Sequence, residues 1–245
     1  MTNRISDSAA DFLYFYLLGV TIEDITNMDE KDLIVKCAER AYLDLNRTLK
    51  FKKIPKEEKE HYQELQEQKK EFRTKISNEI ADSIMELLKT KQNYDNWHQD
   101  TCEKKIIIKA KEYEQKGCLQ KNGKESFYYG QAQKWLNMTI KYMWITGKWE
   151  CIFENLIDYL HVPVDSYIIK AVLECEDFSE VKKVIPKQDI EKDKVENNIL
   201  PWSKWIYTDY ISFQEAIRTA LKDNKKMTPF EWEGNAWIEI AKRSK

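Results

Sequence analysis

The sequence predicts an all-α protein, and three observations support that fold class. Only 6 Gly and 5 Pro occur in 245 residues, too few for the many tight turns of a β-sandwich or barrel. Hydrophobic residues make up 42% of the chain and charged residues 33%, the balance of a soluble globular protein. Apolar residues recur at spacings of three and four, the period of an amphipathic helix. We expect a compact multi-helix globular protein.

The first part of the chain predicts three or four helices. Residues 6–19 begin with cap-forming Ser and Asp, continue with an apolar stripe and end at Gly19. Residues 21–51 predict one or two more helices. One apolar face of this segment is made by Leu33, Ile34, Cys37, Ala38, Ala41, Tyr42 and Leu45. Residues 52–90 predict a long charged helix, starting at Pro55, whose polar half lies at the surface.

The middle of the chain predicts a helix over 93–117 and then a turn or short hairpin over 118–126, where an Asn-Gly pair occurs. Residues 130–143 predict an amphipathic helix, and residues 147–160 another. The buried stripe expected for the helix over 130–143 consists of Leu136, Thr139, Ile140 and Met143.

The last part begins with residues 161–174, in which Pro163 starts a turn and Asp165 with Ser166 can cap the next helix. The remaining segments are predicted as an exposed connection with one short element (176–200), a helix (203–223) and a terminal helix (228–245).

The chain length suits one large domain or two small ones. We expect residues 1–95 to form an N-terminal helical subdomain. Residues 96–245 would form a helical core with a hairpin-like motif and C-terminal aromatic helices. This division is compatible with two helical subdomains that surround a cleft.

Composition and motifs exclude several classes. No run reaches the roughly 18 apolar residues of a membrane helix, and residues 11–20 lack the basic start of a signal peptide. The 5 cysteines are scattered and the 3 histidines lie far apart, so we expect reduced thiols, a cytoplasmic location, no metal and no cofactor. We find no phosphate-loop motif for an NTPase, and no Ser-His-Asp, HExxH or paired-carboxylate motif for a hydrolase.

Charge is distributed unevenly along the chain. Residues 101–150 hold 10 basic and 5 acidic side chains, although the whole chain has a net charge of −2. A local basic stripe is what phosphate binding requires. A solvated lysine-rich surface is the alternative interpretation.

Lys134 and Asp165 are the two candidate catalytic residues. Lys134 lies in the first turn of the predicted helix, about 200° round from the buried stripe, so we expect it not to face the core directly. There it can bind phosphate beside unpaired backbone N–H groups, or act as a nucleophile where desolvation favours its neutral amine. A plain surface lysine is the alternative. For Asp165 the alternative is an ordinary N-cap, and one aspartate can fill both roles.

The two residues belong to a recognisable pattern. Gly130-x-x-x-Lys134 opens an apolar helix, and 31 residues after the lysine a Val-Pro-Val-Asp turn ending at Asp165 opens another. This resembles the helix-hairpin-helix DNA glycosylases with an associated lyase activity, and the long separation is most similar to the archaeal 8-oxoguanine glycosylase branch. The resemblance covers about residues 120–175. At the hairpin the sequence has one glycine, Gly130, where the family has more.

The resemblance implies a DNA glycosylase/AP-lyase-like enzyme that excises a modified or damaged base. The target nucleotide would leave the base stack, Lys134 would attack the sugar C1′ and form a Schiff base, and Asp165 would stabilise positive charge on the sugar. β-Elimination could then cut the strand. The implied partner is DNA. The substrate-binding candidates, with a phosphate site at the first two, are Gly130, Gln131, Gln133, Trp135, Trp202, Lys204 and Trp205.

Residues 200–210 are the predicted pocket wall, because aromatic and basic side chains concentrate there. The alternative is a helix start capped by Ser203 with buried tryptophans. Trp144 is a further candidate for stacking on an extruded base.

Two other functions stay open. A non-enzymatic helical interaction protein would use the charged helix at 55–90 and the aromatic C-terminus as binding faces. A helical component of antiviral (phage) defence acting on nucleotides is the third interpretation. The feature that separates the enzyme from the interaction protein is whether Lys134 and Asp165 meet in a cleft.

Overall fold

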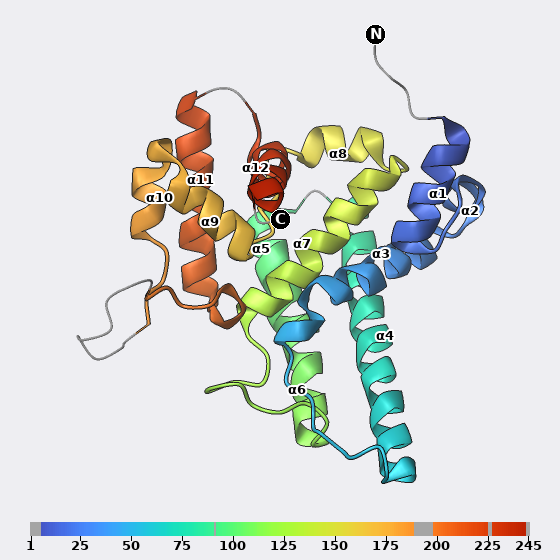
Figure 1. Ribbon diagram of the computed structural model, residues 1–245. Helices are drawn as coiled ribbons and strands as arrows, with labels where there is room; N and C mark the ends of the chain where they lie inside the picture. The colour runs from blue at the N-terminus through green and yellow to red at the C-terminus, as the bar shows by residue number, and fades with distance from the viewer. Residues whose placement is uncertain (1–5, 91, 189–197, 225–226, 244–245) are drawn as a thin grey trace.

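The chain is built from helices joined by turns and loops (Figure 1). The computed structural model describes residues 6–90, 92–188, 198–224 and 227–243. The first helices are α1 (Asp7–Leu18), α2 (Ile22–Asn27), α3 (Glu30–Leu45) and α4 (Lys59–Lys89). The later ones are α5 (Tyr94–Asp100), α6 (Ile108–Gln115), α7 (Tyr129–Thr146), α8 (Glu150–Leu156), α9 (Ser166–Glu174), α10 (Ser179–Lys183), α11 (Tyr207–Asn224) and α12 (Pro229–Arg243). In these ranges β-structure is limited to two isolated bridges, so the all-α prediction is confirmed.

Local capping sets the ends of the first helices. The Ser6 side chain accepts a hydrogen bond from the backbone of Ala9, and Gly19 ends α1 with φ of 69°, a conformation that favours glycine. Thr21 and Asp24 form a capping box on α2. The helix predicted over 6–19 is therefore confirmed at both ends.

α3 buries the apolar face that its spacing predicts, and all seven residues of that face are buried. This face packs against α4 and α7. The C-terminal half of α4 shares the core through Phe72, Ile76, Ile80 and Ile84. Its first turns are mostly exposed, as the charged sequence predicted, and they extend beyond the end of α6 (Figure 1).

α5 and α6 are joined by a π-helical segment, Thr101–Ile107, so residues 94–115 form one continuous helical stretch. π-Helical turns are rare and occur frequently near functional sites. This one packs against α4 and α7 and buries Cys102, one turn after the buried His98. It therefore brings polar side chains against the central helix.

α7 is the central helix, and neighbours surround it (Figure 1). The four residues of its predicted apolar stripe are buried. The alternative of a plain surface lysine is wrong for Lys134, because only 4% of its surface is exposed although it does not share the face of the apolar stripe. The face opposite the stripe meets α12 and the start of α9 instead of solvent, through contacts of Lys134 and Lys141.

The connections follow the predicted turns more closely than the predicted boundaries. In segment 118–126 the backbone N–H of Asn122 donates to the carbonyl of Glu125 at 2.9 Å, which closes a turn. α11 begins at Tyr207, four residues after the predicted start, and a short 3-10 turn, Trp202–Lys204, precedes it. The predicted connection 176–200 contains a 3-10 turn at Glu176–Phe178 and α10, and its residues 189–197 lie outside the described residues.

The two predicted parts, 1–95 and 96–245, contribute to one hydrophobic core. α3 from the first part packs along α7 from the second, and the Nε1–H of Trp135 donates to the carbonyl of Ala38 at 2.8 Å. Independent folding of two subdomains stays a prediction. None of the helices described has the length and apolarity that crossing a membrane requires.

Candidate functional site

Lys134 and Asp165 meet inside the protein. The Nζ atom of Lys134 lies 2.8 Å from Oδ2 of Asp165, and the two side chains are 5% and 12% exposed. α7 carries the lysine, and the aspartate stands at the start of α9. The contact that the sequence left open is therefore formed.

Asp165 is both an N-cap and an ion-pair partner. Its Oδ1 accepts hydrogen bonds from the backbone N–H groups of Tyr167 and Ile168 at 2.9 and 3.0 Å. Its Oδ2 accepts from Lys134 and, at 3.3 Å, from the indole N–H of Trp237 in α12. One oxygen thus holds α9 while the other faces the lysine, so the cap fixes the carboxylate that the site uses.

The electrostatics of the pair favour two charges at rest. Burial alone would raise the pKa of Asp165, but the Lys134 ammonium and the two backbone N–H groups outweigh burial, and the net shift is downward. The resting site is therefore a carboxylate paired with an ammonium. Removing either partner would leave the other as an unpaired buried charge, which lowers the stability of the folded protein.

The pair borders a hollow of about 530 Å³ between α3, α7, α9 and α12. A second buried ion pair, Lys141 with Glu233, lines the same hollow. Burial raises the pKa of Glu233, and the Lys141 ammonium opposes that rise. Trp237 and Tyr167 supply two aromatic rings, whose centroids lie 5.2 Å apart. The hollow therefore combines two lysine–carboxylate pairs with an aromatic wall.

Sequence reasoning missed Lys141, Glu233, Tyr167 and Trp237. Lys141 follows Lys134 by seven residues, two helical turns on the same face, so helical spacing could have found it. Glu233 and Trp237 are four residues apart and share one face of α12. Nothing in the sequence says that this face meets α7, because the two helices are about ninety residues apart in the chain.

Two predicted phosphate contacts have other partners. The backbone N–H of Gly130 donates to the carbonyl of Trp205 at 2.9 Å. A Cβ at Gly130 would lie 1.9 Å from the carbonyl oxygen of Trp202, so the glycine permits a close backbone approach. The Gln131 side chain bonds the backbone of Tyr128 and of Thr48. The Gly130 amide is therefore not free for a phosphate, and the expected phosphate contact there is wrong.

The other predicted binding residues do not line the hollow. Gln133 is buried and bonds the backbone of Gly130 and Val164. Trp135 is fully buried beside the rings of Tyr42 and Phe72. Residues 200–210 bury Trp202 and Trp205, as the alternative expected, but the helix begins at Tyr207 and not after a cap at Ser203. Lys204 is half-buried, and Trp144 packs on Phe230 at the surface. Only Lys134 and Asp165 of the predicted site residues reach the hollow.

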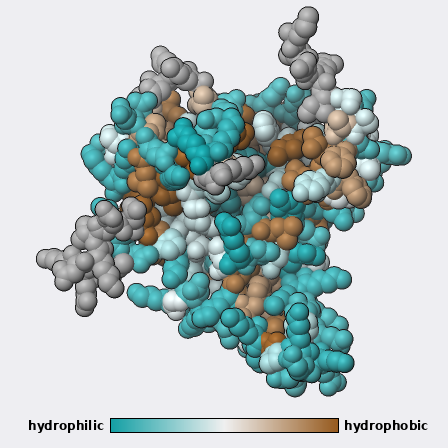
Figure 2. Space-filling view, viewed as in Figure 1, coloured by the Kyte–Doolittle hydropathy of each residue, from teal (hydrophilic) through white to brown (hydrophobic). Residues whose placement is uncertain are grey.

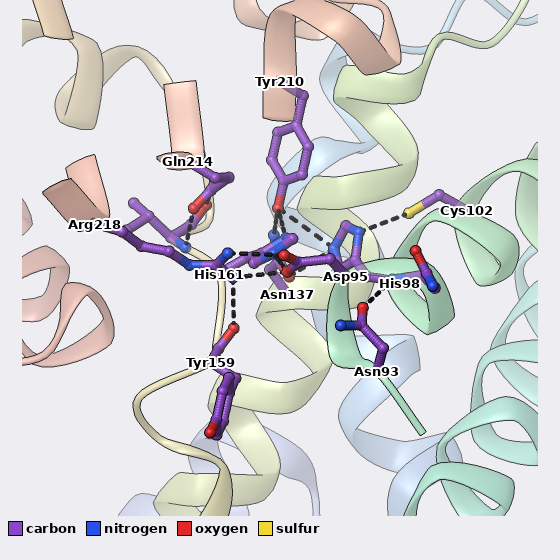
Figure 3. A network of polar contacts seen from close by, with 12 residues as sticks. Asn93, Asp95, His98, Cys102, Asn137, Tyr159, His161, Tyr210, Gln214 and Arg218 are labelled. Carbon is purple, nitrogen blue, oxygen red and sulfur yellow. Dashed lines mark hydrogen bonds and ion pairs between the residues drawn. The ribbon is translucent and has the colours of Figure 1, made fainter. Parts of the chain in front are cut away.

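A second polar centre lies in the core beside α7 (Figure 3). His161 contacts Asp95 through Nε2 at 2.7 Å and Tyr210 through Nδ1 at 2.8 Å. Arg218 binds both oxygens of Asp95 at 2.8 and 2.9 Å. His98 contacts Asn137 through Nε2 at 3.0 Å. The network fills the junction of α5, α7 and α11 with polar groups that are hydrogen-bonded to one another, although the buried Nε of Arg218 has no partner among the described residues.

The hydrogen bonds and the burial of His161 and His98 indicate that both histidines are neutral. His161 donates from Nε2 to the Asp95 carboxylate, so its Nδ1 accepts from the Tyr210 hydroxyl. Burial lowers the pKa of His161 to about 4, and burial also holds the pKa of His98 well below its usual range. Asn137 donates to Gln133, and Gln133 bonds Val164, the residue before Asp165. The core network therefore supports the backbone that carries the candidate site.

Lowering the pH from about 6.5 to about 4 is expected to weaken folding through His161. An unfolded histidine titrates near 6.5, whereas the folded state keeps His161 neutral down to about 4. In this window the unfolded state binds more protons, so the free energy of unfolding falls as the pH falls. The loss attributable to His161 is about 3 kcal/mol.

The measurement is urea unfolding between pH 7 and 4 for the wild type and His161→Gln. The wild type should lose more stability than the variant over this range. Parallel stability profiles for the two proteins would contradict this assignment.

Within the described ranges, no group of three or more His, Cys, Asp or Glu side chains is placed to hold a metal ion. Comparisons of the chain with protein-family models, with curated proteins and with solved structures found no match.

Proposed function

We propose that this protein is a DNA glycosylase/AP-lyase-like enzyme that removes a modified or damaged base through an imine on Lys134. The observation that carries the proposal is the buried 2.8 Å contact between Lys134 and Asp165 at the edge of the hollow. A lysine nucleophile and a carboxylate that act at the same sugar carbon need functional groups within reach of that carbon, and this contact meets that requirement. The basic stretch at 101–150, which includes both lysines of the hollow, is the second support.

The resting pair must first exchange a proton, because only a neutral amine has a lone pair with which to attack carbon. The Lys134 ammonium can pass a proton to Asp165 across their hydrogen bond. An uncharged base that fills the hollow would exclude water from the pair. Loss of solvation favours two neutral groups over two buried charges, so substrate binding would activate the lysine.

The bond changes then balance. The Lys134 nitrogen bonds to C1′ of the sugar while the bond from C1′ to the base breaks. The base leaves with that electron pair and takes the proton from Asp165. The restored carboxylate stabilises the positive charge next to it. It then carries a proton from the nitrogen to the ring oxygen as the sugar opens, which leaves a protonated imine.

Strand cleavage can follow from the imine. The Asp165 carboxylate takes a proton from C2′, the electrons of that C–H bond form a C2′–C3′ double bond, and the bond from C3′ to its phosphate oxygen breaks, so that its electron pair leaves with the phosphate. Hydrolysis of the imine then frees Lys134. The lyase activity therefore needs the same lysine as base removal.

The hollow offers contacts suited to a flipped base. The Trp237 and Tyr167 rings provide an apolar face, and the Lys141–Glu233 pair provides a donor and an acceptor for the edge of a base. Its volume of about 530 Å³ lies within the range of small-molecule sites. Because a duplex buries its bases, the nucleotide must leave the stack to reach Lys134.

The test is borohydride trapping of the full chain on DNA. The protein is incubated with duplexes that contain an abasic site, 8-oxoguanine or uracil, and with an undamaged duplex as control. Borohydride reduces an imine to a stable amine, so a covalent protein–DNA band is expected with the abasic duplex and with any duplex whose base is excised. The absence of a band with all three modified duplexes would contradict the proposal.

One observation favours the alternative, a non-enzymatic helical interaction protein. α1 exposes Phe12, Leu13, Phe15 and Tyr16, with 68%, 49%, 63% and 81% of their surfaces accessible. Figure 2 shows hydrophobic residues gathered on the face around α1 and α3. Exposed apolar clusters of this kind commonly mark interaction sites. Failure of trapping together with failure to retain DNA at low salt would favour this function over the enzyme.

A further inference from the structure

The charged groups that line the hollow are matched except for one. Lys134 pairs with Asp165, Lys141 with Glu233, and Arg40 with Asp44 at 3.0 Å. The remaining cation is Arg47, whose side chain makes no ion pair or hydrogen bond with any residue that the structure describes. Arg47 is exposed at the rim, whereas Lys134 is buried. The hollow therefore has one excess positive charge, and that charge lies at its entrance.

Arg40 lines the same hollow as Arg47 and is held in place by its neighbours. Its Nη1 donates to Oδ1 of Asp44, and its guanidinium lies 5.1 Å from the centre of the Tyr142 ring. The Tyr142 hydroxyl donates to the other oxygen of Asp44 at 2.7 Å. The half-buried guanidinium is thus held by a carboxylate and an aromatic ring, and only one of its five N–H groups has a hydrogen bond to a described residue.

The segment that carries Arg47 is attached to the start of α7. Arg47 stands in a 3-10 turn, Asn46–Thr48, that follows α3. The Gln131 amide donates to the carbonyl and to the hydroxyl of Thr48 at 3.1 and 3.0 Å. Gln131 lies one helical turn before Lys134, so this contact fixes the backbone of Arg47 relative to the lysine.

We propose that Arg47, together with Arg40, binds one phosphate group of the nucleic acid whose nucleotide occupies the hollow. This proposal rests on the function proposed above and names its phosphate contact. A phosphodiester carries one negative charge, which matches the one unpaired cation. A guanidinium can bind two phosphate oxygens at once. In this proposal the two arginines take the role of phosphate contact that the sequence had suggested for the Gly130 amide. That amide instead donates its hydrogen bond to the carbonyl of Trp205.

The test is DNA binding by the full chain carrying Arg47→Gln. The probe is a fluorescent duplex with a tetrahydrofuran abasic analogue, titrated by anisotropy between 50 and 200 mM salt. The matched control is Arg243→Gln, another exposed arginine that does not line the hollow. Arg47→Gln is expected to weaken binding and to reduce the slope of log Kd against log salt by about 0.9, the value for one phosphate contact. Arg243→Gln should leave both unchanged.

Two further arms identify the source of the phosphate. Inorganic phosphate and a nucleoside 5′-monophosphate are each tested as competitors of the duplex. If the two free phosphates compete only at concentrations far above the concentration at which unlabelled duplex competes, the bound phosphate is the phosphodiester of a DNA strand. Equally effective competition by the free monophosphate, lost in Arg47→Gln, would overturn the strand assignment and indicate a free nucleotide.

The outcomes also separate this proposal from the enzymatic one. Arg47→Gln is expected to form the borohydride adduct at saturating DNA, because Lys134 is intact. Unchanged affinity and salt slope in Arg47→Gln, with a normal adduct, would overturn the Arg47 proposal and leave the enzyme. Arg47-dependent binding with no adduct in the wild type would retain the phosphate site and reject the lyase. A wild type that binds neither duplex nor competitor overturns the phosphate site.

Discussion

Replacing Lys134 by glutamine is expected to abolish the borohydride adduct and to slow single-turnover base excision at least about a thousandfold. Glutamine has no nucleophilic lone pair, so neither the bond to C1′ nor the imine can form. Its amide can still donate a hydrogen bond to Oδ2 of Asp165, which limits disruption of the buried site. The measurement is single-turnover base release from the modified-base duplex that the wild type traps, with the thermal midpoint of each protein as a check on folding.

Two variants control this experiment. Lys170→Gln alters an exposed lysine of α9 that pairs with Glu174 and does not line the hollow, and it should behave as the wild type. Asp165→Asn keeps an oxygen that can cap α9 but removes the charge beside the sugar, so it should slow the reaction and leave α9 capped. An adduct formed by Lys134→Gln at the wild-type rate would contradict the role given to Lys134.

Replacing Gly130 by alanine is expected to lower the free energy of unfolding by at least about 3 kcal/mol. The new methyl group would stand 1.9 Å from the carbonyl oxygen of Trp202, so the backbone of the Trp202–Lys204 turn must move away from α7. That movement also breaks the hydrogen bond from the Gly130 amide to Trp205. Urea unfolding measured by tryptophan fluorescence checks the prediction.

The chain offers a matched glycine for comparison. Gly234 lies within α12, and a Cβ there would meet nothing within 4 Å. Gly234→Ala should therefore be neutral or stabilising by about 0.5–1 kcal/mol, since alanine is the better helix former. Equal stability of the two alanine variants would contradict the close backbone contact at Gly130.

The sequence predicted those features that depend on local periodicity and capping. The buried face of α3, the end of α1 at Gly19 and the cap at Asp165 each follow from a few neighbouring residues. Such features can be predicted from neighbouring residues alone, because side-chain spacing and capping act within one or two helical turns. The spacing of Lys134 and Asp165 allowed the two side chains to meet but did not require it, and the structure supplies that contact.

The surroundings of α7 could not be predicted in this way. Helical spacing separates the two faces of α7 but does not say which element covers each face, so the burial of Lys134 under α9 and α12 could not be predicted. Gly130 looked like part of a phosphate-binding turn, and its real partner, the Trp202–Lys204 turn, lies about seventy residues further along the chain. Glu233 and Trp237 reach the hollow only because α12 folds back onto α9. Such contacts are tertiary, and a single sequence carries little signal for them.

The most direct test of the central claim is to identify the residue that carries the trapped sugar. The wild-type protein is reduced with borohydride on an abasic duplex, digested with nuclease and protease, and analysed by tandem mass spectrometry. The adduct is predicted on Lys134, with Lys141 in the same hollow unmodified. An adduct on Lys141, on the N-terminal amine or on lysines spread over the surface would contradict the claim that Lys134 and Asp165 form the reactive site.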